Sequence, residues 1–467
     1  MEKLSGMDAG FWYLHGKNSP MYLGAVLRVE PKVDGIGISA EELVELFAAR
    51  RGRLAALTKK VWTPRFGIGF PHWVEDDEFD FAYHIVSEPE PFDQADELDV
   101  IVADFFVTHL DKDRPPWQIR LCHDTNGNTF ILVKLHHALL DGGLGLEILA
   151  AVVDVGTSDD LHELSVPSMS AATKTPNPVD IALESVIDLV SGRIPAFLNL
   201  KKRFSEARNE PEGHLGAALG SLFAGTPCEI SGALSDQREF RSVSFPLTVL
   251  SAHAKRINTT INNALLSIIA GAMTRYFQER GLDPIESLLA LVPISLRGQG
   301  SENGEIASSK NRLTGMLVSL PTTTQSPLER LEMTTKAVVE SRAIVDSLGA
   351  EVLHELGSLV ATPLISMAVD LASDLSLFDS INPLFNLVVS NLSGVDFPLY
   401  LLGHRIDSII PIGPLAEGSG LNITAYSYLD KMELGLLSCP RLVQDPDLLV
   451  ESIIAELDEV ERIQVTV

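Results

Sequence analysis

Alternating apolar and polar positions predict short strands in the first third of the chain. Met21–Val29 is one such run, and Thr129–Leu135 is the clearest, since aliphatic and β-branched residues dominate it. Apolar residues at helical spacing predict helices at Ser39–Ala49, Leu98–Leu110 and Leu144–Val153. Ser39 and Glu42 have the spacing of a capping box, so the first of these helices is expected to begin there.

The second half repeats this mixture. Strands are predicted at Phe240–Phe245, Leu288–Val292, Met316–Leu320, Leu387–Ser390, Leu421–Tyr426 and Leu434–Ser438. Helices are predicted near Leu247–Ile257, Ile261–Arg280, Leu328–Leu348 and Pro446–Ile463. Between the halves, Gly156–Asp180 reads as linker, Ile181–Ala207 as helical and Asn209–Ser235 as loop. We therefore predict an α/β protein with domains at 1–155 and 237–467, joined by a crossover segment at 156–236.

Composition narrows the class of protein. The 467 residues are 45% hydrophobic and 21% charged, which is ordinary for a globular chain and excludes disordered and fibrous classes. With 63 acidic and 36 basic residues, the net charge of −27 argues against a general nucleic-acid binder. Three scattered cysteines (Cys122, Cys228 and Cys439) are too few for a disulfide framework or a Cys-rich metal site, which favours a reducing, cytoplasmic setting.

Targeting signals are weak. The first eight residues lack a basic start followed by an apolar run, so a signal peptide is not expected. No stretch of about 18 uncharged apolar residues occurs, so we expect no membrane-spanning helix. The segment Arg193–Phe204 is compatible with attachment to a membrane surface, because its apolar and basic residues interleave as in an interfacial anchor. A crossover helix packed on the domains explains that segment equally well.

The most informative string runs from Lys134 to Gly143 and follows directly on the clearest strand. Such a junction often presents a reactive side chain on a rigid scaffold. Because neighbouring strand residues point to opposite faces, one of His136 and His137 can face a cavity while the other packs inward. Histidine is suited to proton transfer near neutral pH. Asp141 follows, and Gly142 and Gly143 permit tight backbone geometry or close substrate approach.

Two other interpretations of the histidine pair need weighing. A pair of histidines alone is more often a packed or surface feature than a catalytic site. Zinc binding is a second competitor, but the HExxH pattern is absent and no nearby Cys or Glu completes a ligand set, so no metal is expected. The full string His-His-x-x-x-Asp-Gly is far more specific than the pair.

That string resembles the signature of the CoA-dependent acyltransferase superfamily, and further elements are similar to bacterial wax ester synthase/diacylglycerol acyltransferases. These elements follow the family's order along nearly the whole chain: Met7–Phe11, Ser19–Gly24, Trp73–Asp76 with Phe79, Asp80 and His84, Asp113–Trp117, Val292–Arg297, Asn311–Arg312, Ser390–Gly394 and Leu421–Thr424. Asp113–Trp117 departs from the family's Pro-Leu-Trp element by having Pro116 in place of Leu.

The resemblance implies two chloramphenicol-acetyltransferase-like domains with the active site in a tunnel between them. It implies transfer of an acyl group from acyl-CoA, a co-substrate, to diacylglycerol or a long-chain alcohol, with no permanently bound cofactor. His137 would be the general base, beside His136. Asp141 would pair with Arg297 to support the loop. Substrate contacts would involve Gly142, Gly143, Pro116 and Trp117.

The resemblance also implies an oxyanion donor from the second domain. The family's Asn-Asp motif corresponds to Asn262 and Asn263, so Asn262 would donate its amide N–H. Asn263 replaces the aspartate. If that aspartate orients a partner through a charged hydrogen bond, an amide does so less strongly. If it caps a helix, Asn and Asp are nearly equivalent.

Two competing functions remain open. One is acyl transfer from a carrier protein, as in peptide-synthetase condensation domains. The other is a catalytically weak lipid-binding or droplet-coat protein, which Asn263 leaves open while the intact histidine string speaks against it. Because CoA is itself anionic, the acidic chain is expected to gather Lys and Arg near the tunnel mouth or the crossover segment.

Overall fold

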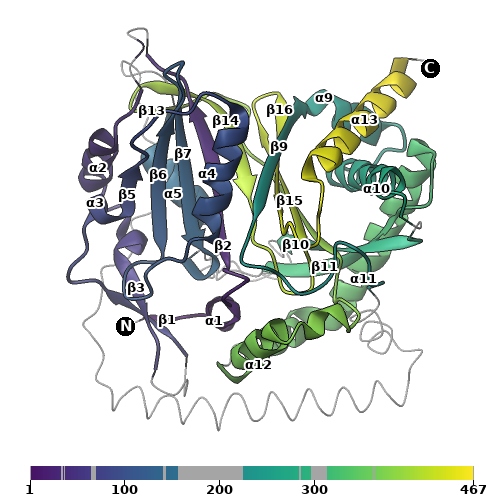
Figure 1. Cartoon of the computed structure of the whole chain (residues 1–467), viewed down its shortest axis with the longest axis horizontal. Helices are drawn as coiled ribbons and strands as arrows, with labels where there is room; N and C mark the ends of the chain where they lie inside the picture. The colour runs from purple at the N-terminus through teal and green to yellow at the C-terminus, as the bar shows by residue number, and fades with distance from the viewer. Residues whose placement is uncertain are drawn as a thin grey trace, which may run out of the picture.

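A computed structural model describes residues 2–32, 35, 37–64, 70–139, 144–155, 225–282, 285–295, 313–360 and 363–465. Most of the predicted crossover segment lies outside these ranges, including Ile181–Ala207 and Arg193–Phe204. The predicted strands all occur, with small shifts at their ends. The helix predicted at Leu328–Leu348 is longer, and spans Pro327–Val360. The molecule has two halves, each built on one large sheet, and these stand side by side (Figure 1).

The first half is built on a seven-stranded sheet. Its strands, in spatial order, are β5 (Ile85–Ser87), β6 (Trp117–His123), β7 (Thr129–His136), β2 (Tyr22–Val29), β14 (His404–Ile412), β13 (Leu399–Leu401) and β8 (Asp154–Val155). The helices of this half are α2 (Ala40–Ala49), α3 (Phe81–His84), α4 (Ala95–Val107) and α5 (Leu144–Val152), with a 3₁₀ turn, η1, at Ala55–Thr58. The predicted capping box of α2 is present, because Ser39 and Glu42 exchange hydrogen bonds.

Two strands of this sheet come from the far end of the chain, which corrects the predicted domain boundary. We expected residues 237–467 to form one separate domain. Instead, β14 pairs antiparallel with β2 from Ile406 opposite Val29 to Ile412 opposite Gly24. The neighbouring β13 pairs with β8. Sequence order suggested the boundary, but the sheet register joins segments that no local pattern links.

The second half is built on a six-stranded sheet. Its strands, in spatial order, are β11 (Leu313–Pro321), β10 (Ser287–Ser295), β12 (Leu387–Leu392), β15 (Leu421–Tyr428), β16 (Lys431–Ser438) and β9 (Glu239–Pro246). Its helices are α9 (Leu247–Lys255), α10 (Ile261–Glu279), α11 (Pro327–Val360), α12 (Pro363–Asp374) and α13 (Pro446–Val465), with a 3₁₀ turn, η5, at Leu377–Asp379. Both halves are thus mixed α/β, as the residue pattern predicted.

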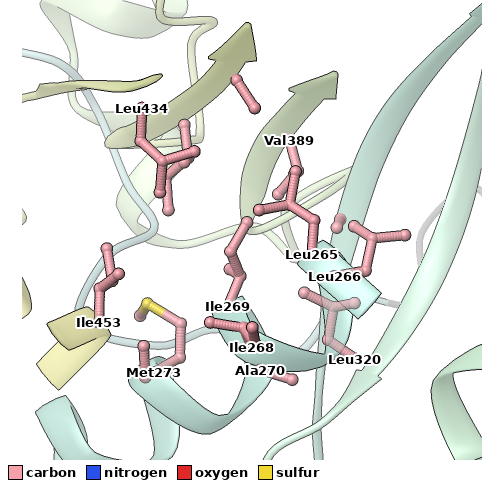
Figure 2. Packing of buried hydrophobic residues seen from close by; sticks show 14 of the residues in the cluster. Leu265, Leu266, Ile268, Ile269, Ala270, Met273, Leu320, Val389, Leu434 and Ile453 are labelled. Carbon is pink, nitrogen blue, oxygen red and sulfur yellow. The ribbon is translucent and has the colours of Figure 1, made fainter. Parts of the chain in front are cut away.

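Helix α10 is the centre of the second half. Its apolar residues lie on all sides of the helix, which is the pattern of a buried helix. Side chains such as Leu265, Ile269 and Met273 have no exposed surface and pack against the sheet and α13 (Figure 2). Each fully buried aliphatic side chain of this kind contributes about 1.5–3 kcal/mol. The beginning of α10 is therefore held rigidly.

The two halves meet through shared apolar packing. Tyr22, Val26 and Leu132 of the first half join Phe240 and Leu437 of the second in one buried cluster. At Gly435 in β16, an added Cβ would lie 1.8 Å from the carbonyl oxygen of Pro411 in β14, so only glycine permits this close approach of the sheets. A residue with a side chain there would force the halves apart.

The first helix, α1 (Gly6–Leu14), bridges the halves from below in Figure 1. Ser5 caps it by accepting a hydrogen bond from the Asp8 amide at 3.2 Å. It contacts the 3₁₀ turn η3 (His137–Leu139), and also α11 and α12. A small sheet of β1 (Glu2–Lys3), β4 (His72–Glu75) and β3 (Lys59–Trp62) lies in the same half. None of the described helices is long and apolar enough to cross a membrane.

Candidate active site

The backbone around His137 is held on both sides. Strand β7 ends at His136, and His137 begins η3. The His137 amide donates to the carbonyl oxygen of Met21 at 2.8 Å. The next amide, of Ala138, donates to Nδ1 of His136 at 3.1 Å. The main chain on either side of the His137 side chain is therefore fixed by hydrogen bonds, which suits a residue that must meet a substrate in one orientation.

The His137 ring is held by stacking, and one of its nitrogens is buried. Phe11 of α1 stacks on it, with ring centroids 3.6 Å apart and planes inclined by 25°. The residue is partly exposed, yet its Nδ1 is buried with no hydrogen-bond partner among the described residues. Burial lowers the pKa of the imidazole to about 4, against an opposing effect of the residue's own backbone. The ring is therefore neutral near pH 7 and able to accept a proton.

His136 has the opposite character. It is 2% exposed and is enclosed by the rings of Trp12, His15 and Tyr22. Its Nε2 lies 3.1 Å from Nδ1 of His15, and its Nδ1 accepts from the Ala138 amide. Burial holds the pKa of His136 well below its ordinary value. The prediction that one histidine packs inward is confirmed, and the inward residue is His136.

The predicted second-domain pair lies in the first turn of α10. Thr260 caps this helix and accepts from the Asn263 amide at 3.2 Å. The Asn263 side chain is buried, and its Nδ2 donates to the Thr259 hydroxyl at 2.8 Å. Asn262 is partly exposed, and its side chain bonds to no other residue in the described ranges. Asn263 therefore stabilises the helix start, whereas the Asn262 amide is available to a ligand.

Four predicted residues lie outside the described part of the chain. These are Asp141, Gly142, Gly143 and Arg297. The ion pair between Asp141 and Arg297 stays a prediction, as do substrate contacts at the two glycines. The tunnel between the domains also stays a prediction.

Pro116 and Trp117 lie next to the strand end that carries the histidine pair. We expected them to bind substrate, but Trp117 is only 1% exposed, and its indole N–H donates to the carbonyl oxygen of Leu57 at 2.7 Å. The Trp117 ring stacks on His84 at 4.5 Å. The carbonyl oxygen of Pro116 accepts from the His136 amide at 2.9 Å. A side chain buried in the core cannot reach a ligand, so we correct the role of Trp117 to packing.

The sequence elements Trp73–Asp76 and Asp113–Trp117 meet at the buried carboxylate of Asp76. Asp76 is 5% exposed and accepts hydrogen bonds from Lys60 at 3.0 Å and from Arg114 at 3.3 Å. Burial raises the pKa of this carboxyl, but the hydrogen bonds from Lys60, the Glu78 amide and Arg114 outweigh it and lower the pKa below its ordinary value. This ion-pair cluster ties β4 to the loop before Pro116 and thus stabilises the base of the site.

The described residues hold no group of three or more His, Cys, Asp or Glu side chains arranged for a metal ion. All three cysteines are free, and Cys122 and Cys439 are fully buried.

Sequence reasoning missed Phe11 and His15, which contact the histidine pair, and His109, which bonds to His15. Phe11 was noticed only as part of the motif Met7–Phe11, and its stacking partner lies far along the chain. His15 and His109 stand alone in the sequence, with no partner at motif spacing. Their hydrogen-bonded neighbours are 121 and 94 residues away, respectively, so only the fold brings these rings together.

Comparison with known proteins identifies the family. Residues 4–265 match the wax ester synthase/diacylglycerol acyltransferase catalytic domain, and residues 310–461 match the C-terminal domain of the same family. The chain is 27% identical over 484 residues to the O-acyltransferase WSD of Acinetobacter baylyi, covering 98% of this chain and 99% of that one. A putative diacylglycerol O-acyltransferase of Mycobacterium tuberculosis is 29% identical over 471 residues, covering 99% and 96%.

Solved structures show the same fold. The wax ester synthase/diacylglycerol acyltransferase from Marinobacter aquaeolei VT8 superposes with a TM-score of 0.68 at 21% identity, covering 99% of this chain and 100% of that one. The first condensation domain of the CDA synthetase matches with a TM-score of 0.54 at 14% identity, covering 98% and 95%. Both domain models of one family match in order, and together they span most of the sequence. The chain belongs to the wax ester synthase/diacylglycerol acyltransferase family.

Proposed function

We propose that this protein transfers an acyl group from acyl-CoA to the hydroxyl of diacylglycerol or a long-chain alcohol, forming triacylglycerol or a wax ester. Family membership supports O-acyl transfer as the general reaction. The assignment of the base rests on the environment of His137. This residue is a neutral, partly exposed imidazole whose backbone is fixed on both sides and whose ring is stacked on Phe11.

The reaction needs one proton acceptor and one oxyanion donor. His137 takes the hydroxyl proton as the oxygen attacks the thioester carbonyl carbon. The tetrahedral intermediate then collapses, the carbon–sulfur bond breaks, and the CoA thiolate takes the proton from the imidazolium. The products are an ester and free CoA, so no covalent acyl-enzyme and no further reactant are required.

The geometry supports a choice between the two nitrogens of His137. Nδ1 is buried, so a substrate hydroxyl cannot reach it, whereas the partly exposed ring leaves Nε2 as the nitrogen open to substrate. We therefore assign the proton of the neutral ring to Nδ1 and the accepting lone pair to Nε2. Asn262, whose amide has no partner in the described ranges, is the proposed donor to the oxyanion.

The test compares labelled palmitoyl-CoA with dodecanol or diacylglycerol as acceptors, followed by identification of the lipid product. Wild type is expected to form ester, and His137→Ala is expected to lose about 10³-fold of that rate while remaining folded. Retention of most of the rate by His137→Ala would disprove the base assignment. Ester formed only from an acylated carrier protein would favour the condensation-type reaction instead, and lipid binding without turnover by wild type would favour a non-catalytic role.

Attachment to membranes or lipid droplets is a separate proposal. It rests on the basic and apolar residues of Arg193–Phe204, which lie outside the described ranges, and on the lipid character of the proposed acceptors. Flotation with liposomes or droplets is expected to fall when Lys201, Lys202 and Arg203 are replaced by Ser. Unchanged flotation of that variant would remove the proposal.

A further inference from the structure

Three histidine rings from separate segments form a hydrogen-bonded series beside the active site. Nε2 of His136 lies 3.1 Å from Nδ1 of His15, which follows α1. Nε2 of His15 lies 3.0 Å from Nδ1 of His109, which follows α4. Nε2 of His109 lies 3.1 Å from the carbonyl oxygen of Lys17. The series runs from a buried ring, His136, to an exposed one, His109.

The bonding partners at the two ends of this series determine which nitrogen of each ring carries the proton. A neutral imidazole has one N–H donor and one acceptor nitrogen. The Ala138 amide can only donate, so Nδ1 of His136 must accept and its proton must lie on Nε2. That N–H donates to Nδ1 of His15, which places the proton of His15 on Nε2 as well. The same step applies to His109, whose Nε2–H donates to the Lys17 carbonyl, a group that can only accept.

The segment around His109 is held in place by hydrogen bonds on both sides. The segment that carries His109 is held by buried Lys134, whose Nζ donates to the carbonyl oxygen of Thr108 at 2.8 Å. On its other side, the Leu110 amide donates to the hydroxyl of Tyr22 at 2.7 Å.

The loop that carries Lys17 is held from the second half of the molecule. Buried Arg238, just before β9, donates to the carbonyl oxygen of the neighbouring Asn18, and also to the carbonyl oxygens of Ser235 and Gln237. The terminal acceptor of the series is therefore fixed by contacts that do not involve the histidines.

We propose that His15 and His109 are positioning residues, which hold His136 in its Nε2–H tautomer so that its Nδ1 clamps the amide beside His137. The inference rests on the proposed role of His137 as the base. If His136 carried its proton on Nδ1, that N–H would face the Ala138 N–H, and the turn that presents His137 would lose its support. The series thus acts on the proton acceptor through the backbone rather than through contact with substrate.

The surroundings favour the neutral rings that this series needs. Burial, with smaller effects of His109 and Lys112, lowers the pKa of His15 to about 3. A second proton on any of the rings would set two N–H groups against each other. A metal site is the competing explanation for three neighbouring histidines. It does not fit, because the rings bond in series instead of converging on one point, and no such cluster is found in the described ranges.

A matched pair of variants tests the series. The amide of Asn lies near the place of an imidazole Nδ1, whereas that of Gln lies near the place of Nε2. His15→Asn keeps an acceptor for His136, so its kcat is expected within about threefold of wild type. His15→Gln removes that acceptor and is expected to lower kcat by about tenfold or more with little change in KM, the size of effect seen for outer partners of catalytic groups. Equal kcat values for the two variants would overturn the inference.

A spectroscopic measurement tests the series independently of activity. Nitrogen-15 spectra of the histidine rings in the folded wild-type protein are expected to show His136, His15 and His109 as neutral Nε2–H tautomers. Assignment of an Nδ1–H or a doubly protonated ring to His136 near pH 7 would refute the series whatever the enzyme does. A wild type without acyl transfer but with the expected tautomers would instead leave the series standing and remove the proposed function.

His123 supplies the control. It is in the same half, and its Nε2 bonds to a main-chain carbonyl oxygen, that of Ile38, at 2.9 Å, but it is not in the series. His123→Gln keeps a donor there and is expected to leave kcat and the three tautomers unchanged. His109→Leu, at the exposed end, is expected to fold normally and to lower kcat several-fold. Full activity of His109→Leu with altered His15 tautomers would also overturn the proposed coupling.

Discussion

Each half of the molecule carries a pair of identical neighbouring residues from the predicted site, and each pair divides the same way. At the end of β7, His136 is buried with both nitrogens bonded, while His137 is partly exposed and its Nδ1 has no partner among the residues that the structure describes. At the start of α10, Asn263 is buried and bonded to Thr259, while Asn262 is partly exposed and unbonded in the described ranges. One member of each pair builds the support, and the other is left available for chemistry.

The two pairs differ in how far along the sequence the partners of the buried residue lie. Asn263 belongs to a local cap, since its partners Thr259 and Thr260 are within four residues of it. His136 depends on His15 and His109, which come from distant parts of the first half. Proton acceptance by an imidazole needs a defined tautomer, whereas an amide N–H donates without any choice of tautomer. We infer that the proposed base requires a long-range support because its chemistry depends on which nitrogen carries the proton.

The sharpest test of this comparison separates activity from stability at the histidine pair. His137→Ala should reduce acyl transfer by about 10³-fold and change the free energy of unfolding by less than about 1 kcal/mol, because the lost ring is partly exposed. His136→Ala should lower the free energy of unfolding by about 2–4 kcal/mol, since it leaves a cavity and an unpaired amide. Urea unfolding and product formation measure the two effects. If His137→Ala is the less stable variant, the assignment of support and base is reversed.

The asparagine pair should separate in the same manner with smaller effects. Asn262→Ala should lower kcat by about 10²-fold, the usual effect of one oxyanion donor, without changing the unfolding midpoint. Asn263→Ala should lower the free energy of unfolding by about 1 kcal/mol through loss of its bond to Thr259. Steady-state kinetics with acyl-CoA and dodecanol, together with thermal unfolding, distinguish them. Wild-type kcat in Asn262→Ala would remove this residue from the mechanism.

The pH dependence of catalysis should reflect the lowered pKa of His137. Because burial lowers its pKa to about 4, the ring stays neutral and able to accept a proton down to that pH. The value of kcat/KM should therefore hold between pH 7 and about 5, and fall tenfold per unit below about pH 4. Circular dichroism at each pH separates this effect from unfolding. An acidic limb centred near 6.5 would mean that the ring is solvated in the working enzyme.

Restoring the family residue at position 263 should have the smallest effect. Asn263→Asp turns the donor to Thr259 into an acceptor, and Thr259 can supply its hydroxyl proton because its contact with Thr335, at 3.1 Å, works in either direction. A carboxylate is also favoured in the first turn of a helix. We expect stability within about 1 kcal/mol and kcat within about threefold of wild type. A gain of tenfold or more would show that the amide weakens this enzyme.

The features that could be predicted from the sequence are those that depend on the pattern of neighbouring residues. Strand β7 follows from its run of aliphatic residues, the start of α2 from its capping box, and the inward and outward roles of the histidines from strand alternation. Sequence reasoning missed β14, because nothing in residues 404–412 indicates that β2 is the partner. It misjudged Trp117, since a family motif does not say whether its members touch substrate or core. His15 and His109 were invisible as a set, since each is a lone histidine until the fold is formed.

Strand β14 has a consequence for the order in which the molecule is made. During synthesis, β2 leaves the ribosome long before β14, the strand that covers its free edge. Until then, β2 presents unpaired backbone groups, which are a template for association with other chains. Domains usually fold as units from the N-terminus, and this chain cannot complete its first sheet in that manner. The nascent protein thus has a long period in which one edge of β2 is open, and this period ends only when residues 404–412 have been made.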